Sequence, residues 1–542
     1  MKEEIIKKIE DVLTRLGVED PKVNFDVAAR IELGDYSSNV AMMYAKQLGR
    51  NPLDFANAIR DELEKGDIAS TVKVDAIAPG FLNFFFDRNY FNEAIKKPFE
   101  KGDVFADQKT IIEYTDPNPF KEFHIGHMMS NTVGESLSRI IEANGVEVKR
   151  ANYQGDVGLQ VAKAVWAMRK GTGLMEAYAE GHKAYEESEE AKKEIVVINK
   201  EIYEHSNPEI NDIYEEGRQK SLLYFEVLYK ILGTEFDYYF FESEVSDFGK
   251  ETVLKNIGQI FEKGEEGAVI FKGENYDKKL HTRVFVNKEG LPTYEAKELG
   301  LAKVKYDRYA YDSSIVVTAN EISEYFKVLL KAMSLVFPDL AQKTKHISHG
   351  LMKLPSGKMS SRTGTIISAE SLIDQVKEKV KEKIDDDAIA EIIAIGAIKY
   401  SILRQAIGGD IIFDFDKSIS FEGDSGPYLQ YSAVRAKSLL KKSVDQVALS
   451  QKLPEKWETT NLERYLERFP SIIEKAGREY APHHIATYLI ELAGEFNSFY
   501  ASHKIIDPED PTSPYRLALT KAFAEVMTKG LDLLGIRVPV RM

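Results

Sequence analysis

The sequence contains no cysteine among its 542 residues, which excludes disulfide bonds, catalysis by a thiolate and zinc sites built from thiolates. Its ten histidines include no HExxH pair, so no zinc is expected. The sequence also lacks any run of about eighteen apolar residues, and its first residues predict an amphipathic helix instead of a secretion signal. We therefore expect a cytoplasmic protein without a membrane segment.

An excess of positive charge is also missing. The sequence contains 72 Lys and Arg residues but 87 Asp and Glu residues, which gives a formal net charge of −15. Broad, non-specific binding to nucleic acid depends on basic residues that neutralise phosphates, so this balance argues against it. Residues 421–542 differ, because they hold sixteen residues of each sign. If RNA binds the chain, it must use local patches and base stacking.

The length predicts about three domains. Residues 1–105 combine a helical pattern at 40–64 with alternating strands at 71–77 and 81–86, on either side of a Pro-Gly turn, which indicates an α+β domain. Residues 381–542 are almost purely helical and predict an all-α bundle.

Residues 106–380 predict an α/β domain. A strand, a proline-rich bend, a helix and a second strand follow one another as a βαβ unit, at residues 111–115, 116–119, 124–143 and 146–153. Charged, helix-forming sequence predicts a helical insertion at about 170–265. The apolar, β-branched segment 314–318 is typical of a buried parallel strand.

The segment Phe123-His124-Ile125-Gly126-His127 opens the helix after the bend. A helix N-terminus offers free N–H groups and partial positive charge to an anion, and a glycine there lets a base or phosphate approach the backbone. The segment therefore favours a nucleotide site. HxGH also occurs in other nucleotidyl-transferring α/β enzymes and by chance, so the alternative is a capped helix that carries two surface histidines.

A second segment, GKMSSRTG at residues 357–364, places Lys358, Arg362 and several hydroxyl groups between glycines. Loops of this kind can close over a triphosphate and stabilise the charge that develops on it. Taken alone, the segment favours a solvated turn.

Together the two segments resemble the HIGH and KMSK signatures of class I aminoacyl-tRNA synthetases. Longer stretches resemble the arginyl-tRNA synthetase family, and they cover essentially the whole chain: GDYSSN at 34–39, PGFLN at 79–83, IEYTDPNPFKEFHIGH at 112–127, NYQGDVGLQ at 152–160, SFEGDSGPYLQY at 420–431 and GIRVPVRM at 535–542.

This resemblance implies a class I, Rossmann-like catalytic domain with a doubly wound parallel sheet, an N-terminal domain that contacts tRNA and a helical anticodon-binding domain. It implies an arginine–tRNA ligase, which activates L-arginine with ATP to arginyl-adenylate and transfers it to the 3′-terminal ribose of tRNA(Arg). Mg²⁺ is expected with ATP. L-arginine and tRNA(Arg) are the expected partners, and a monomer is usual in the family.

The resemblance also implies roles for individual residues. ATP would be bound by residues of the two signatures, namely His124, Gly126, His127, Lys358, Met359, Ser360, Ser361 and Arg362. The amino acid would be bound by Glu113, Asn118, Gln160, Tyr294, Glu298 and Glu321. Tyr294 and Glu298, four residues apart on a predicted helix, would bind the guanidinium group. Without the resemblance, each of these acids would be an ordinary solvated charge.

The sequence departs from the family pattern at Ser361, where a class I enzyme usually has its catalytic lysine. Some arginyl-tRNA synthetases that lack this lysine carry one shortly before HIGH, and Lys121 stands three residues before His124. We therefore predict that Lys121 supplies the missing positive charge, with Lys358 and Arg362 assisting. Glu298 also departs, because aspartate is usual at this position.

Three other functions stay open. They are a class I synthetase for glutamate or cysteine, a nucleotidyltransferase that makes a small-molecule adenylate, and a non-catalytic tRNA-binding paralogue without the lysine at 361. A class I synthetase for cysteine would require thiolate ligands for zinc, and this chain has no cysteine to provide them. In the C-terminal bundle Tyr428 and Tyr431 are candidates for base stacking, whereas we expect Tyr480 to be core.

Overall fold

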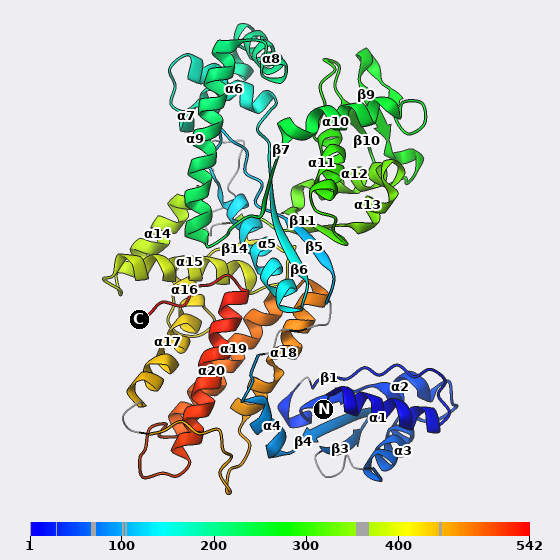
Figure 1. Ribbon diagram of the computed structural model, residues 1–542, viewed down its shortest axis with the longest axis vertical. Helices are drawn as coiled ribbons and strands as arrows, with labels where there is room; N and C mark the ends of the chain where they lie inside the picture. Colours follow the sequence, from blue (N-terminus) through cyan, green and yellow to red (C-terminus); the bar gives the residue numbers. More distant parts are fainter. Residues whose placement is uncertain are drawn as a thin grey trace. The chain divides into compact units, whose positions relative to one another are not determined.

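A computed structural model of the chain describes residues 2–28, 30–66, 72–99, 102, 106–353, 368–443 and 447–542. The chain forms two compact units. Unit 1 contains Met1–Glu100, Tyr431–Lys475 and Tyr488–Gly530, and unit 2 contains Lys101–Gln430, Ala476–Thr487 and Leu531–Met542 (Figure 1).

Unit 1 begins with an α+β domain. Four antiparallel strands pair in the order β1-β2-β4-β3: β1 (Asp26–Val27), β2 (Tyr36–Ser38), β3 (Val72–Ile77) and β4 (Phe81–Phe86). Four helices accompany them: α1 (Lys2–Arg15), α2 (Val40–Ala45), α3 (Pro52–Glu64) and α4 (Arg88–Ala94). The apolar face of α1 packs with the inner faces of α3 and β4 in one core, because each element alternates buried and exposed positions at its own period.

The rest of unit 1 is helical. Long helices supply it: α17 (Gly426–Ser443), α18 (Asn461–Glu479), α19 (His483–Ser502) and α20 (Ser513–Leu533). Glu467 of α18 joins this bundle to the α+β domain, since its carboxylate accepts hydrogen bonds from the hydroxyls of Tyr36 (2.8 Å) and Tyr90 (2.5 Å). Arg464 on the same helix pairs with Asp35. These buried polar contacts fix the domain on the helix.

Unit 2 is built on a parallel sheet with the strand order β12-β11-β5-β6-β7. Its strands are β5 (Lys109–Glu113), β6 (Glu147–Gln154), β7 (Tyr238–Phe241), β11 (Ser313–Ala319) and β12 (Thr344–His349). Helix α5 (Ile125–Ala143) connects β5 to β6 and is buried over most of its length. The order reverses between β5 and β11, which confirms the predicted doubly wound α/β sheet.

Two groups of elements rise from the carboxyl edge of this sheet (Figure 1). The first is helical: α6 (Leu159–Arg169), α7 (Leu174–Glu187), α8 (Glu189–Glu204) and α9 (Pro208–Leu232). The second surrounds a small antiparallel sheet: α10 (Glu242–Lys255), β8 (Glu262–Lys263), β9 (Val269–Lys272), β10 (Thr282–Val286), α11 (Tyr294–Arg308), α12 (Ser323–Val336) and α13 (Pro338–Lys343). Further elements complete the unit: β13 (Met352–Lys353), α14 (Ala369–Lys381), α15 (Asp387–Leu403), β14 (Ile411–Ile412) and α16 (Phe415–Ser418).

The segment expected to be a helical insertion contains a strand of the main sheet. β7 pairs with β6 in parallel register, Ala151 opposite Tyr238. Its sequence, Tyr-Tyr-Phe-Phe, consists of residues that favour strands, but four residues between two helices give too short a pattern to predict a strand.

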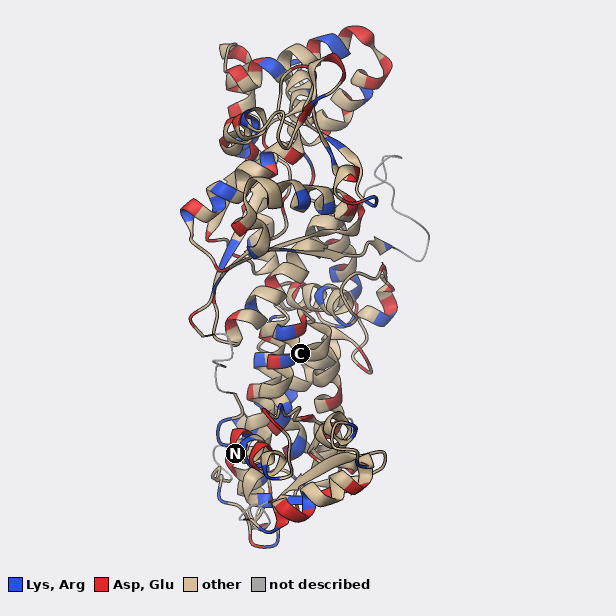
Figure 2. Cartoon of the chain, turned by 90° about the vertical axis from the view of Figure 1, so that its right-hand side faces the viewer, with Lys and Arg blue, Asp and Glu red and all other residues tan. Residues whose placement is uncertain are grey.

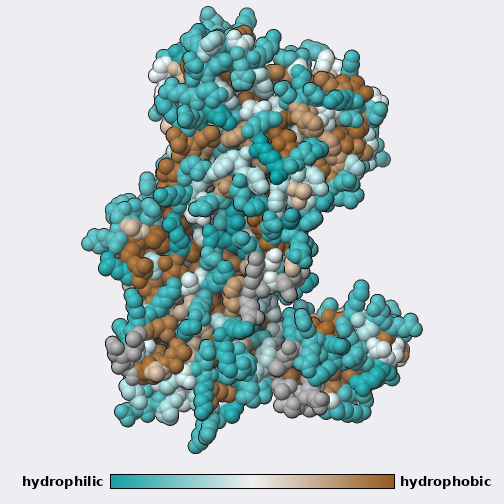
Figure 3. Space-filling view, in the orientation of Figure 1, coloured by the Kyte–Doolittle hydropathy of each residue, from teal (hydrophilic) through white to brown (hydrophobic). Residues whose placement is uncertain are grey.

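Acidic and basic residues alternate along most elements rather than forming one basic face in the view of Figure 2. The surface seen in Figure 3 is largely hydrophilic, with separate hydrophobic patches. Among the described residues, no helix combines the length and apolar character that crossing a bilayer requires.

Gly217 of α9 offers a test of the packing inside the helical group. A Cβ atom at this position would lie 2.3 Å from Cε1 of Phe120, whose ring is fully buried. We expect Gly217→Ala to lower the free energy of unfolding by about 1–3 kcal/mol, because the ring has no free space to move into. Thermal unfolding followed by circular dichroism measures this.

The matched control for that substitution is Gly494→Ala in α19, where a Cβ atom meets nothing within 4 Å. Alanine is the better helix former by about 1 kcal/mol, so the control should be neutral or stabilising. A Gly217→Ala protein as stable as the control would show that the ring of Phe120 is not held there.

Candidate active site

The site lies at the carboxyl edge of the parallel sheet, where the strand order reverses. Glu113 is the last residue of β5, and Glu321 follows β11 in a short 3-10 turn. Ligands of doubly wound sheets bind in the crevice at this point of reversal.

The loop after β5 has an unusual backbone. Thr115, Asp116 and Phe120 have φ values of +83°, +47° and +68°. These values lie in the left-handed region, which residues other than glycine rarely adopt. Hydrogen bonds hold the loop in place: the Asp116 carboxylate accepts from the backbone N–H of Tyr153 (2.8 Å), and the side-chain amide oxygen of Asn118 accepts from the backbone N–H of Gly155 (3.1 Å). Strain of this kind persists where neighbouring structure enforces it, often at functional sites.

His124 and His127 cap the N-terminus of α5 reciprocally. Nδ1 of His124 accepts from the backbone N–H of Gly126 (3.1 Å), and Nδ1 of His127 accepts from that of His124 (3.2 Å). The two rings stack with centroids 3.6 Å apart. A Cβ atom on Gly126 would lie 2.9 Å from the His124 ring, so this arrangement needs glycine.

Both histidines are neutral in this setting. Burial, with repulsion from Lys121, lowers the pKa of His124 to about 4, and burial lowers the pKa of His127 well below its usual value. Because both Nδ1 atoms accept hydrogen bonds, each neutral ring carries its proton on Nε2. The pair can therefore donate hydrogen bonds to a phosphate, but it is not set up to carry protons.

Lys121 lies beside the histidines. Its Nζ donates to Oε1 of Gln160 (2.7 Å) and lies 4.4 Å from the centroid of the Tyr178 ring. Burial, followed by repulsion from Lys163, lowers the pKa of Lys121 to about 8. The predicted catalytic lysine and HIGH histidines are thus brought together.

The second signature, including Lys358, Met359, Ser360, Ser361 and Arg362, lies outside the described residues. The chain returns from it beside the histidines. Ser368 forms a β-bridge with His124, and the N–H of Ala369 donates to the carbonyl of Phe123 (2.9 Å).

Four acids, one of them Glu113, and two lysines form a cluster at the end of β5. Glu113 accepts from Lys305 (2.7 Å) and Glu242 accepts from Lys297 (2.5 Å), and all four side chains are nearly fully buried. The other two acids, Asp116 and Glu298, have no ion-pair partner among the described residues. Burial, with repulsion from Glu113, raises the pKa of both well above the usual range. The cluster therefore has two more carboxyl groups than lysines.

Two phenol groups add unsatisfied oxygens next to these acids. The hydroxyls of Tyr153 and Tyr325 are buried and have no hydrogen-bond partner in the described part of the chain. Burial raises the pKa of both, and the charge of Glu298 contributes in each case. Buried polar groups without partners are rare, so this space is suited to a ligand with several N–H donors.

The other residues predicted from the sequence differ in how far they are buried. Tyr294 begins α11 with a side chain that is 54% exposed, and Glu321 is exposed. Gln160 contacts Lys121 through its carbonyl oxygen, while its amide nitrogen is buried without a partner in the described structure. Tyr480 was expected to be core, and this is wrong: it is half-buried, with Nζ of Lys345 3.6 Å from the centroid of its ring.

Sequence reasoning missed several residues of the site. Asp116 lies within the quoted bend, and Glu242 directly follows β7, as Glu113 ends β5. An acid at the end of a parallel strand indicates such a position, but β7 had not been predicted. Lys297 and Lys305 lie on the predicted helix, yet only the structure shows that they face inward.

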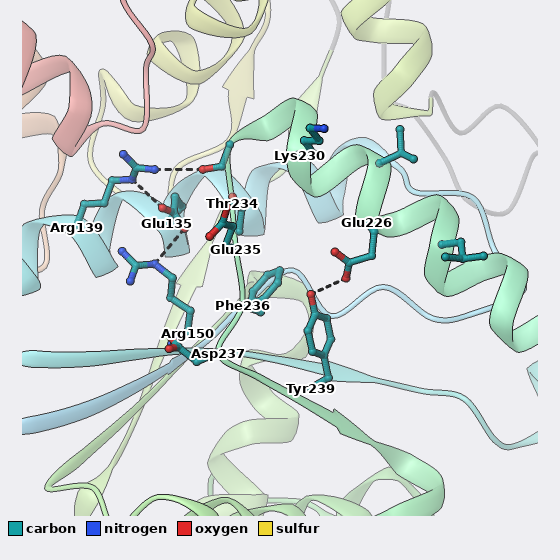
Figure 4. Close-up of a pocket in the computed structure, with 13 residues that line it drawn as sticks. Glu135, Arg139, Arg150, Glu226, Lys230, Thr234, Glu235, Phe236, Asp237 and Tyr239 are labelled. Atoms are coloured by element: carbon teal, nitrogen blue, oxygen red, sulfur yellow. Dashed lines mark hydrogen bonds and ion pairs between the residues drawn. The ribbon is translucent and has the colours of Figure 1, made fainter.

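A cavity of about 1030 Å³ lies elsewhere, near the amino ends of β6 and β7 (Figure 4). Several of its charged side chains are paired: Glu135 accepts from Arg139 (2.7 Å) and contacts Arg150 (3.4 Å), and Tyr239 donates to Glu226. It shares no residue with the cluster at the carboxyl edge.

The doubly wound sheet, the capping histidines and the neighbouring lysine define a class I aminoacyl-tRNA synthetase catalytic domain. Three family models match the chain: "Arginyl tRNA synthetase N terminal domain" over residues 2–86, "tRNA synthetases class I (R), catalytic domain" over 95–415 and "DALR anticodon binding domain" over 429–542.

Curated relatives agree. The arginine–tRNA ligase of Fusobacterium nucleatum is 30% identical and covers 96% of this chain and 95% of its own length, and that of Clostridium perfringens is 28% identical with 97% of each chain covered. The chain therefore belongs to the arginyl-tRNA synthetase family.

Solved structures share the fold. The arginyl-tRNA synthetase of Thermus thermophilus matches with a TM-score of 0.78 at 23% identity, over the whole of both chains. That of Plasmodium falciparum matches with a TM-score of 0.80 at 19% identity, over 100% of this chain and 99% of its own. The likeness confirms the α/β, α+β and all-α composition.

Proposed function

We propose that the acid-rich cluster at the carboxyl edge binds L-arginine and that the His124–His127 corner binds ATP. Arginine and ATP would then react where these two sites meet. As a member of its family the chain is an arginine–tRNA ligase. One observation carries the placement of arginine: Asp116 and Glu298 form no ion pair within the described part of the chain, and arginine brings two positive charges, its α-ammonium and its guanidinium group.

The guanidinium end fits Glu298. A guanidinium group has five N–H donors in one plane, and the nearby hydroxyls of Tyr153 and Tyr325 are acceptors for which the described residues supply no donor. The α-ammonium end fits Asp116 and Asn118, at the bend after β5. Glu113 then acts through Lys305 and its own charge rather than as a free ligand, which modifies the role expected for it.

The arginine carboxylate attacks the α-phosphorus of ATP, and pyrophosphate leaves. Nε2–H groups of His124 and His127, the partial positive charge of the α5 N-terminus and the Lys121 ammonium stabilise the negative charge of the transition state. The 3′-terminal ribose hydroxyl of tRNA then attacks the carbonyl carbon of the adenylate, an ester forms, and AMP leaves. No protein nucleophile is needed.

Mg²⁺ comes with ATP in this proposal, because this ion binds phosphate oxygens and usually reaches such sites with the nucleotide. The bundle matched by the anticodon-binding model receives tRNA, and the exposed ring of Tyr431 is a stacking candidate. We propose that the chain acts as a monomer, which sedimentation analysis can test.

The experiment that tests the function is ATP–pyrophosphate exchange with each amino acid, run with and without total tRNA. We expect exchange with arginine alone among them, and more of it when tRNA is present. Exchange with glutamate would assign another class I synthetase, and no exchange with any amino acid would leave a tRNA-binding paralogue.

Arginine binding should depend on pH. The free enzyme has raised pKa values at Asp116 and Glu298, and a bound cation favours their ionised forms and lowers these values. Binding therefore releases protons, and the affinity for arginine should fall as the pH drops through the raised pKa values of the free enzyme. The slope should approach about tenfold per pH unit for each proton released.

Calorimetric titration of arginine in two buffers of different ionisation enthalpy measures that proton release. Binding of citrulline, which is neutral at the guanidinium position, should be much weaker and should release fewer protons. Arginine binding with no proton release at any pH would contradict the assignment of Asp116 and Glu298.

A further inference from the structure

The helical group of α6–α9 holds Lys121 from outside the sheet. Phe120, the residue before it, is buried in the apolar core of this group, and its N–H donates to Oγ of Ser221 on α9 (2.9 Å). Gly217 leaves room for the Phe120 ring. The positive φ of Phe120 then turns the chain so that Lys121 faces α6 and α7.

Two groups of that helical layer contact the Lys121 ammonium. Gln160, at the start of α6, accepts its hydrogen bond at 2.7 Å. Tyr178, half-buried on α7, presents its ring face at 4.4 Å. An aromatic face within about 6 Å attracts a cation, and more strongly where water is excluded.

Other charges around Lys121 oppose or balance one another. Lys163 of α6 repels it, and Glu242 of α10 attracts it. His124 and His127 of α5 are neutral, and His182 of α7 is engaged with Lys163 at 3.0 Å. Among these neighbours only Glu242 favours the charged lysine, and Lys297 already pairs with that acid. The ring of Tyr178 is thus an important stabiliser of the ammonium.

We propose that Tyr178 is a positioning residue for the activation step: its ring and the Gln160 carbonyl hold the Lys121 ammonium beside the HIGH histidines. The proposal rests on the function proposed for Lys121. It assigns the helical insertion a part in amino-acid activation, through one aromatic ring that packs against the catalytic lysine.

The test compares Tyr178→Leu, which removes the ring, with Tyr178→Phe, which keeps the ring face and loses only the hydroxyl. We expect Tyr178→Leu to lower the rate of arginine-dependent ATP–pyrophosphate exchange about tenfold, with the KM for arginine unchanged. Tyr178→Phe should stay close to the unaltered enzyme. Because the charged lysine loses a stabilising contact, the alkaline limb of kcat/KM for ATP should move to lower pH by up to about one unit.

The chain offers a matched control on the same helix. Tyr185 of α7 is also half-buried, and its ring lies 4.2 Å from Nζ of another lysine, Lys163. Tyr185→Leu removes a comparable contact and should leave exchange unchanged. Thermal unfolding of each variant separates loss of structure from loss of activity. If Tyr178→Leu does not fold, Gln160→Leu tests the other contact that holds the Lys121 ammonium.

A double-mutant cycle distinguishes the positioning role of Tyr178 from the catalytic role of Lys121. If Tyr178 acts through Lys121, Tyr178→Leu should cause no further loss in a Lys121→Ala enzyme. Equal tenfold losses in both backgrounds, or no loss in the unaltered enzyme while Lys121→Ala is impaired, would overturn the role of Tyr178. An unimpaired Lys121→Ala enzyme would instead refute the function of Lys121 itself.

Discussion

Replacement of Lys121 by alanine should lower the rate of arginine-dependent ATP–pyrophosphate exchange by about 10²–10³-fold. The lysine is half-buried beside the capping histidines, and a fixed positive charge there acts on the developing charge of the phosphates in a medium of low polarity. Both histidines are neutral, so they cannot replace it. Exchange at saturating ATP and arginine measures the effect.

Charge, rather than shape alone, should account for this loss. The pKa of Lys121 is lowered to about 8, so its positive charge is present below that pH and disappears as the pH rises through it. We expect kcat/KM for ATP to decline above about pH 8, and Lys121→Arg to retain activity at higher pH because a guanidinium group stays charged.

A lysine elsewhere in the insertion provides the control for Lys121→Ala. Lys170 is exposed, and its Nζ lies 3.5 Å from the centroid of the Trp166 ring. Lys170→Ala therefore removes a lysine over an aromatic ring without touching the site, and it should leave exchange unchanged. A Lys121→Ala enzyme as active as Lys170→Ala would assign the missing charge to another residue.

The fold could largely be predicted, because its long elements carry strong periodic patterns. The strand Ser313–Ala319 is an apolar, β-branched run, and helix Ile125–Ala143 begins at a capping motif and ends at Asn-Gly. The short strand Tyr238–Phe241 was missed, because its pairing with β6 depends on a partner more than eighty residues away. The domain boundaries near residues 105 and 380 stay a prediction.

The site was harder to predict, because its chemistry depends on which charges meet. Glu113 and Glu298 were named from resemblance, yet the sequence does not indicate that Lys305 pairs with Glu113 and that Glu298 forms no ion pair with any described residue. Gln160 was expected at the arginine, and this stays a prediction; its contact with Lys121 through the side-chain carbonyl was not expected. Such pairings depend on side chains from separate elements that meet only in the folded chain.

Glu298→Gln should lower kcat/KM for arginine by about the same factor as Lys121→Ala lowers the exchange rate. The loss should appear in the KM for arginine instead of the rate at saturation. The substitution keeps the shape of the side chain and removes the charge that faces the guanidinium group. Loss of one partner from a buried charge pair costs about 2–5 kcal/mol, so we expect kcat/KM for arginine to fall by about 10²–10³-fold, mostly through KM.

The KM for ATP should not change, because Glu298 lies with the amino-acid cluster and its neighbours are Glu113, Lys305 and Glu242. Removing the carboxyl group of Glu298 should also raise the stability of the free protein, since its charge is buried and repelled by Glu113. Higher stability with lower arginine affinity is a combination that damage to the fold would not produce.

Two variants of the same helix complete the test. Glu298→Asp keeps the charge but withdraws it by one methylene, so it should lose less than Glu298→Gln. Asp307→Asn removes an exposed acid from α11 that pairs with Lys303, and it should behave as the unaltered enzyme. If Glu298→Gln kept the KM for arginine, the guanidinium group would have to bind at Asp116 or at Glu242 after displacing Lys297, and the α-ammonium would need another acid.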